Sequence, residues 1–369
     1  MIHALLPLFM ITTLALSATT VGLIEGIAEA TALIVRIFSG ALSDHIGKRK
    51  SLAVFGYGMA TFTKPLFALA NGAGWILFAR FADRIGKGIR GAPRDALIAD
   101  VTPPALHGAA FGLRQSLDTT GAFLGPLLAI ALMLLWANDF RAVFWVAVIP
   151  AVLALALLVF GVQEPAARPR AAHHPFPLSR AALKHLSTDY WWVVAAGAAL
   201  TLARFSEAFL LLRAQQGGYP LALIPLVLVL MNVVYAAAAY PLGVLADRLD
   251  RRALLAFGIA LLIGADLLLA HSASLPWLAG GVLLWGLHMA ATQGLLAAMV
   301  AGTAPDHLRG TAFGMFNLAS GVAMLIASVL AGVLWDSYGA PATFYVGALF
   351  AALSLLLLIR RARAQPPLM

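Results

Sequence analysis

Residues 40–49 read Gly-Ala-Leu-Ser-Asp-His-Ile-Gly-Lys-Arg, and a related stretch at residues 243–252 reads Gly-Val-Leu-Ala-Asp-Arg-Leu-Asp-Arg-Arg, 203 positions further on. The tripeptide Ala-Phe-Gly also occurs twice, at residues 110–112 and 312–314, with an offset of 202. Two landmarks in the same order at nearly the same offset indicate an internal duplication. Parallel halves of this kind place a cavity between them.

The composition places both copies in a membrane. Of the 369 residues, 62% are apolar or aromatic and only 11% are charged, with a mean hydropathy of +0.90. A soluble domain is about a quarter charged, so this chain cannot hide its apolar surface in a water-facing globule. The absence of cysteine excludes disulfides, thiol catalysis and thiolate metal sites.

The apolar segments fall into two sets of six on either side of a polar linker at residues 163–188. A helix needs about 20 apolar residues to cross a bilayer, and an open strand edge would leave backbone groups unpaired in lipid. We therefore predict an all-α integral membrane protein with twelve transmembrane helices, arranged as two pseudo-symmetric six-helix halves at residues 1–162 and 189–369. The expected spans are 2–18, 21–42, 51–70, 74–99, 108–136, 141–162, 190–213, 220–243, 253–271, 276–303, 310–335 and 341–359.

The basic residues predict the orientation. The stretches 48–50, 251–252 and 360–363 lie on the same side as the linker, whereas the opposite side carries Arg141 and Arg213. Positive loops remain in the cytoplasm, so we expect both termini to be cytoplasmic, in a multi-pass protein of the inner (plasma) membrane.

The first span is shorter than its counterpart. Tyr190 precedes Asp247 by 57 residues, whereas Met1 precedes the matching Asp44 by only 43. We expect Met1 to lie inside the first helix of the natural protein. The alternative is a first span that is short but just long enough to cross the bilayer.

The stretch at residues 40–49 resembles the loop signature of the major facilitator superfamily, G-x-x-x-D-[RK]-x-G-[RK]-[RK], with His45 in place of a basic residue. The second copy has Asp250 where the signature has glycine, and residues 80–88 look like a variant of the superfamily's helix 4 motif. The resemblance covers essentially the whole chain. It implies a secondary transporter that rocks two halves around a midplane cavity.

The loop signature can have a mechanical role in addition to setting the orientation of the protein in the membrane. Carboxylates at cytoplasmic helix ends can meet the positive N-terminus of a neighbouring helix, and the basic residues can pair with acids such as Asp95. Such contacts would close the cytoplasmic side and break on rocking. The expected gating residues are Gly40, Asp44, Gly47, Lys48, Arg49, Asp95, Gly243, Asp247, Arg251 and Arg252.

The fifth segment resembles the superfamily's antiporter motif, G-x8-G-x3-G-P, through Gly112, Gly121, Gly125 and Pro126, with Ala129 where a further glycine is usual. The resemblance implies an exporter that exchanges its substrate for protons. The alternative is that these small residues serve close helix packing.

The fourth segment carries the densest intramembrane charge. Arg80, Asp83, Arg84 and Lys87 fall on one side of a helix, and that side cannot face lipid. Charge within a span marks a pathway or a pair. We expect a cationic cavity wall that binds an anionic substrate group, and the alternative is a ladder of ion pairs to neighbouring helices.

The second segment carries Glu25, Glu29 and Arg36 on one face. A buried carboxylate resists ionisation, so the two acids are candidates for proton coupling. They could equally neutralise the basic face of the fourth segment.

Two further pairs are close in sequence. Arg114 and Asp118 are one turn apart, and Arg204 and Glu207 are three residues apart. Each pair could be a local salt bridge, or its acid could accept a proton and exchange its arginine partner. Asp266 and Lys64 have no evident partner in the sequence.

The chain is therefore expected to be a proton-coupled exporter of a small polar, anionic or zwitterionic solute. The alternatives are an importing symporter or facilitator, and a non-transporting receptor or scaffold. No nucleophile motif or metal-spaced histidine cluster suggests an enzyme, and no cofactor, metal or nucleic acid is expected. The expected partners are the substrate, protons and the bilayer, and we expect a functional monomer.

Overall fold

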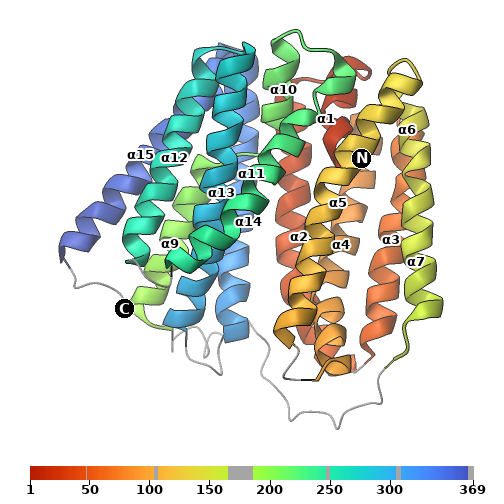
Figure 1. Cartoon of the computed structure of the whole chain (residues 1–369), viewed down its shortest axis with the longest axis horizontal. Coiled ribbons are helices and arrows are strands. Elements are labelled where there is room, and N and C mark those ends of the chain that lie inside the picture. Colours follow the sequence, from red (N-terminus) through yellow and green to blue (C-terminus); the bar gives the residue numbers. More distant parts are fainter. Residues whose placement is uncertain (47, 104–106, 165–185, 247–249, 305–308, 365–369) are drawn as a thin grey trace.

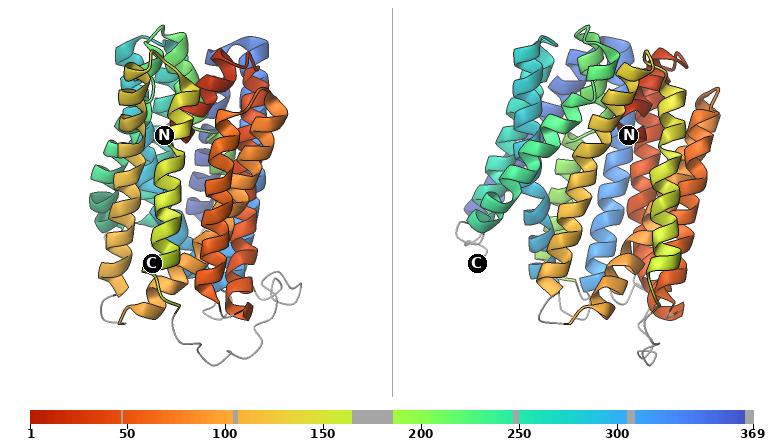
Figure 2. Two further views of the ribbon diagram at one scale, coloured as in Figure 1. Left: turned by 90° about the vertical axis from the view of Figure 1, so that its right-hand side faces the viewer. Right: turned by 45° about the vertical axis from the view of Figure 1, so that its right-hand side comes forward.

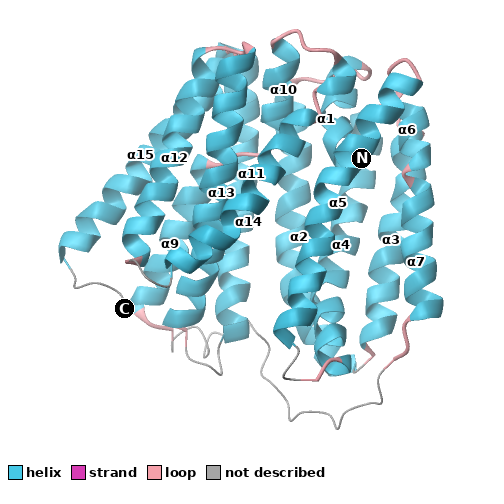
Figure 3. Cartoon of the chain, in the orientation of Figure 1, coloured by secondary structure: helices cyan, strands magenta, loops and turns pink. Residues whose placement is uncertain are grey.

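The computed structural model describes residues 1–46, 48–103, 107–164, 186–246, 250–304 and 309–364. Within these residues the chain is helical and has no strand, as Figure 3 shows. The elements are α1 (Ile2–Thr12), α2 (Ala18–Ile46), α3 (Arg49–Ala68), α4 (Ala73–Val101), α5 (His107–Leu135), α6 (Phe140–Val146), α7 (Val148–Gly161), α9 (Thr188–Ala203), α10 (Ala208–Gln216), η2 (Leu221–Leu223), α11 (Leu226–Ala246), α12 (Arg251–His271), α13 (Leu275–Thr303), α14 (Arg309–Tyr338) and α15 (Ala340–Ala364).

The helices run roughly side by side along one direction, as the views in Figures 1 and 2 show. In Figure 1, the helices of the first part of the chain, α1 to α7, lie on the right, and α9 to α15 lie on the left. Among the described residues, eight helical stretches are long and apolar enough to cross a membrane. The chain is therefore a multi-pass membrane protein with an all-helical fold.

The first span is the shortest of the apolar stretches. α1 ends at Thr12 and has 11 residues, although the apolar segment was expected to extend to residue 18. At about 1.5 Å per residue, 11 residues cover roughly half of the hydrocarbon core. Most of α1 is nevertheless fully buried by its neighbours, among them Phe140 and Phe144, whose rings contact Phe9.

Two of the expected spans are interrupted. The sixth is divided at Ala147 between α6 and α7, and Asp139 caps the first piece by accepting hydrogen bonds from two backbone amides. The seventh is divided at residues 204–207, between α9 and α10. Irregular backbone at membrane depth is tolerated where it is buried in protein or lines a cavity. Phe205 meets this condition, because its ring packs against Phe209, Trp285 and Phe344.

The main contact between the two sides is the long packing of α2 against α14. Here small residues let the backbones approach closely. A Cβ atom at Gly332 would lie 2.5 Å from the carbonyl oxygen of Ala18, and one at Gly314 would lie 3.0 Å from Ile37. The contact therefore extends from the start of α2 almost to its other end. At the upper end in Figure 1, α1 also contacts α10, and α5 contacts η2.

Candidate functional site

The charged face of α4 packs against α2 through ion pairs. The Arg80 guanidinium donates a hydrogen bond to Glu25 Oε2 at 2.6 Å, and Arg84 Nη2 lies 3.3 Å from Glu29 Oε1. Glu25 is 0% exposed and Arg80 is 2% exposed. In this conformation, Glu25 and Glu29 therefore neutralise cations of α4, as one of the two interpretations of the sequence proposed. Their role in proton coupling stays a prediction.

Asp83 belongs to the same helix and turns toward α3. The Lys64 ammonium donates a hydrogen bond to Asp83 Oδ1 at 2.6 Å. Lys64 had no evident partner in the sequence, because its partner lies on the neighbouring helix and depends on the register between α3 and α4. The two helices are in close contact: a Cβ atom at Gly86 would lie 2.6 Å from the carbonyl oxygen of Gly56.

Lys87 differs from the other charges of α4. Its side chain is exposed, and among the described residues it has no ion-pair partner. The nearest charges include the paired Arg84 and Glu29. Lys87 is therefore a cation of this face that is available to a further anionic group.

Asp95 gathers three cations toward the far end of α4. Arg36 from α2, Arg94 from α4 and Arg114 from α5 lie within 3.6 Å of its oxygens, and Arg114 is the closest of the three at 3.1 Å. We expected Asp95 to pair with basic residues of the loop signature, whereas its described ion pairs are with these helix residues. Asp118 joins the group, 3.4 Å from Arg114 and 3.5 Å from Arg94. The local Arg114–Asp118 pair is confirmed as one link of a larger network.

Arg204 and Glu207 lie at the break between α9 and α10. The described partner of Glu207 is His3, whose Nε2 lies 3.9 Å from Glu207 Oε2. The charges of Glu207 and Glu29 both act on Arg204, yet Arg204 has no ion pair among the described residues. Of the two alternatives for this pair, the local Arg204–Glu207 salt bridge is not present among the described residues, because α9 ends at Ala203.

His3 was missed from the sequence, and it joins the two sides of the molecule. Its Nδ1 lies 2.9 Å from the Arg80 guanidinium, while its Nε2 faces Glu207. A neutral imidazole has one nitrogen that accepts and one that donates, so His3 can accept from Arg80 and donate toward Glu207. Its place beside α4 could not be found from spacing, because α1 precedes α4 by more than 60 residues.

A second missed residue lies at the upper end of the α2–α14 contact. Asp336 of α14 accepts hydrogen bonds from the backbone amides of Ala18 and Thr19, at 3.0 and 2.7 Å. It therefore satisfies two of the free amides at the start of α2. A capping acid normally precedes its own helix, so a cap supplied from 317 residues away has no sequence signal.

The helix 5 motif is only partly described. At Gly121 a Cβ atom would meet no heavy atom within 4 Å, so close packing does not require glycine there. At Gly125 it would lie 3.0 Å from the backbone nitrogen of Met1, and Pro126 is buried. The surroundings of Gly112 lie outside the described part.

Several expected gating residues cannot be placed. Gly47 and Asp247 lie outside the described residues, and so do the surroundings of Gly40, Asp44, Gly243 and Arg251. Lys48 is exposed before the start of α3, Arg49 begins that helix, and Arg252 is buried. The gating role of the whole set stays a prediction.

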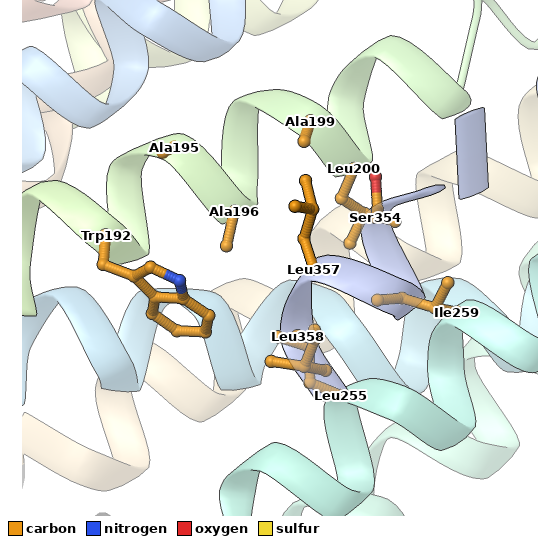
Figure 4. Close-up of a pocket in the computed structure, with 10 residues that line it drawn as sticks. All are labelled: Trp192, Ala195, Ala196, Ala199, Leu200, Leu255, Ile259, Ser354, Leu357 and Leu358. Carbon is orange, nitrogen blue, oxygen red and sulfur yellow. The ribbon is translucent and has the colours of Figure 1, made fainter. Parts of the chain in front are cut away.

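An apolar cavity of about 220 Å³ lies away from these charges, between α9, α12 and α15. Figure 4 shows alanine and leucine side chains around it, with Trp192 at one end and Ser354 at the other. No ionisable side chain lines it. A charged solute would lose its hydration there without compensation, so this cavity does not suit the expected substrate.

Comparison with known proteins identifies the family. The sequence model described as Major Facilitator Superfamily matches residues 1–231 and 208–368. An uncharacterized MFS-type transporter of Methanocaldococcus jannaschii is 32% identical over 366 residues, which cover 97% of this chain and 90% of the relative. The multidrug resistance protein MdtH of Yersinia enterocolitica is 31% identical over 139 residues, covering 37% of this chain and 33% of that protein.

The fold agrees with this result. The crystal structure of the nucleoside transporter NupG (D323A mutant) superimposes with a TM-score of 0.80 at 13% identity, and the match covers 97% of this chain and 94% of that one. At that identity the likeness concerns the fold alone. Together with the sequence match over nearly the whole chain, it shows that this protein is a member of the Major Facilitator Superfamily of transporters.

Proposed function

We propose that this transporter exports a small anionic or zwitterionic solute in exchange for protons. It would have twelve spans in two six-helix halves, residues 1–162 and 189–369, joined by a cytoplasmic linker. It would work as a monomer in the inner membrane, with both termini cytoplasmic and without enzymatic activity. Rocking of the halves would expose a central site to each side in turn.

One observation carries the choice of substrate class. Lys87 from α4 and Arg204 from the α9–α10 break are two cations, one from each side of the molecule, that lack ion pairs among the described residues. Glu29 lies close enough for its charge to act on both. An anionic group between them would meet two cations of opposite halves, and a nearby acid could receive the amino group of a zwitterion.

Export by proton exchange is supported by the helix 5 resemblance. Gly121 needs no small residue for packing, so the alternative explanation of the motif is weaker at this position. The partial similarity to a protein named for multidrug resistance points in the same direction. An importing symporter remains the second candidate, and the direction of flux separates the two.

The test uses inverted membrane vesicles that contain the protein. A proton gradient is imposed, and its dissipation is followed while small carboxylates, phosphate esters, amino acids, metal chelates and cationic drugs are added. We expect proton release with a class of anionic or zwitterionic compounds. Absence of release with correctly inserted protein would contradict proton-coupled export, and release only with cationic drugs would contradict the substrate class.

Two variants test the cations. Lys87→Gln and Arg204→Gln should each raise the substrate concentration for half-maximal proton release by about tenfold, the loss of roughly one charge-assisted contact. Lys50→Gln is the matched control, because its ammonium donates to the carbonyl oxygen of Val159 near the end of α7. An unchanged half-maximal concentration in both the Lys87→Gln and the Arg204→Gln variants would remove these two residues from the site.

A further inference from the structure

Asp266 of α12 is buried deep in the C-terminal part of the chain. It is 0% exposed, and neither carboxyl oxygen has a hydrogen-bond partner. The described acids of α2, α4 and α5 differ from it, because each has an arginine or lysine within 3.6 Å; they are Glu25, Glu29, Asp83, Asp95 and Asp118. Among the described spans, Asp266 is therefore the buried acid without a counter-charge.

The surroundings hold the carboxyl group tightly. A Cβ atom at Gly347 of α15 would lie 2.8 Å from Asp266 Oδ2 and 3.1 Å from the Phe205 ring. The carboxyl group thus fits against the backbone of α15 only because residue 347 is glycine. Phe205 belongs to the α9–α10 break, so Asp266 lies beside the irregular segment that carries Arg204 and Glu207.

Two more buried polar groups without hydrogen-bond partners lie on α13, which packs against α12. The indole nitrogen of Trp285 and Nε2 of His288 have no hydrogen-bond partner, and both residues are 0% exposed. They lie three residues apart on α13, the antiparallel neighbour of α12, and the Trp285 ring contacts that of Phe205 at 5.5 Å. Buried polar groups are normally satisfied, and a set of unsatisfied ones marks a functional position or a bound water.

The orientation of His288 leaves a basic nitrogen free. Its Nδ1 lies 2.8 Å from the Gly258 carbonyl oxygen, which can only accept, so we assign the imidazole proton to Nδ1. Nε2 then keeps its lone pair and has no hydrogen-bond partner. The positive charge of Arg204 acts on this ring from the direction of the α9–α10 break.

Among the described residues, no other helix brings an ion-pair or hydrogen-bond partner to Asp266. α12 itself carries Arg251, Arg252 and His271, all of them near its two ends. Within the described part of α15, the membrane portion contributes Tyr345, which is exposed. The nearest segments with titratable groups are the break, which carries Arg204 and Glu207, and α13, whose His288 contacts α12 at Gly258, eight residues before Asp266.

From this arrangement we propose that Asp266 is the site that binds the exchanged proton; the inference rests on the proposed proton exchange. A buried carboxylate without a counter-charge is far more costly than the neutral carboxyl group. Protonation of a paired acid such as Glu25 would instead leave its arginine uncompensated. In the conformation described here, the proton is bound at Asp266, and it leaves the carboxyl oxygen when rocking admits water.

The first test needs no substrate. Infrared spectra of the purified protein at neutral pH should contain the C=O stretching band of a protonated carboxyl group, and Asp266→Asn should remove it. Asp336→Asn is the matched control, because Asp336 is an exposed carboxylate that caps α2, and it should leave the band unchanged. Absence of the band in the wild type, or its persistence in Asp266→Asn, would overturn the proposal.

A second variant covers the case in which Asp266→Asn does not fold. Gly347→Ala keeps the carboxyl group and places a methyl group against Oδ2, so it should shift the band in frequency. An unshifted band in a folded Gly347→Ala protein would assign it to another acid and overturn the proposal. Gly58→Ala, where a Cβ atom meets nothing within 4 Å, is the control.

The vesicle assay then separates this inference from the proposed function. If the wild type releases protons and Asp266→Asn releases none while still exchanging unlabelled for labelled substrate, the inference is supported. If both release protons equally, Asp266 is not the coupling site, although proton exchange stands. If the wild type releases none with any compound, the proposed function fails, and the infrared band alone reports the protonation of Asp266.

Discussion

One face of α2 packs against α4 and another packs against α14, and the two contacts differ in chemistry. Toward α4, α2 presents Glu25, Glu29 and Arg36, each paired with an oppositely charged residue of that helix. Toward α14 it presents backbone and small side chains, which meet glycines such as Gly332. The first contact joins helices of one side of the molecule, and the second joins the two sides.

The difference suggests which contact is permanent. Separating Glu25 from Arg80 would leave two buried charges unpaired, which costs several kcal/mol. Separating α2 from α14 exposes small apolar residues and leaves no buried charge behind. In a transporter that alternates between conformations, we therefore expect the α2–α4 contact to persist and the α2–α14 contact to open in part.

The largest effect is expected when the charged face is broken. Glu25→Gln leaves the 2% exposed Arg80 without its carboxylate, which should destabilise the protein by about 3–5 kcal/mol. The measurement is the thermal unfolding midpoint of the purified protein in detergent, together with its monodisperse yield. A stability equal to that of the wild type would show that Arg80 is satisfied by another group.

Two controls sharpen this test. Glu29→Gln should cost less, because the Glu29 side chain is 29% exposed and water can replace part of the pair. The double variant Glu25→Gln/Arg80→Gln should recover part of the loss, since it removes both charges. If the double variant is less stable than Glu25→Gln, the pair is not what makes this position sensitive.

An intermediate effect is expected when the glycine face is blocked. Gly332→Ala places a Cβ atom 2.5 Å from the Ala18 carbonyl oxygen and 2.6 Å from Thr19 Cα, so α2 and α14 must separate at this end. The chain has no native cysteine, so spin labels can be attached through Thr13→Cys and Tyr338→Cys. The label distances should shift to larger values, with a small loss of stability.

Gly58→Ala serves again as the control, because a Cβ atom there meets no heavy atom within 4 Å. Its label distances should equal those of the glycine parent. Equal distances for Gly332→Ala as well would mean that the contact absorbs the extra atom without opening.

These two contacts also show what could be predicted from the sequence. The spacing of Glu25 and Glu29 placed both on one face, and the spacing of Arg80 and Arg84 did the same for α4. Oppositely charged helix faces in a membrane protein are most easily buried against each other. The sequence therefore already indicated the contact between these two faces as one of two interpretations. Composition and the duplicated loop stretch were likewise sufficient for the helical membrane fold.

What spacing could not predict is the partner across helices. Lys64 pairs with Asp83 through the register of α3 and α4, and His3 reaches Arg80 and Glu207 through the packing of α1. The break at residues 204–207 contains no proline or glycine, which are the usual signals for the end of a helix. The break can be explained only from the structure, in which Phe205 belongs to an aromatic cluster.

The smallest effect is expected at the upper end of the α2–α14 contact. Asp336→Asn keeps one oxygen acceptor but loses the negative charge that interacts with the amides of Ala18 and Thr19. Removal of a helix cap costs about 0.5–2 kcal/mol, and an amide keeps part of that contribution, so the stability should change little. Asp336 belongs to one side of the molecule and the amides that it caps belong to the other. Its loss should therefore change the distance between the two sides more than the free energy of unfolding. The distribution of spin-label distances should therefore broaden toward the larger distances of Gly332→Ala, while the unfolding midpoint stays near the wild-type value. A lowered midpoint with unchanged distances would show that Asp336 stabilises α2 alone.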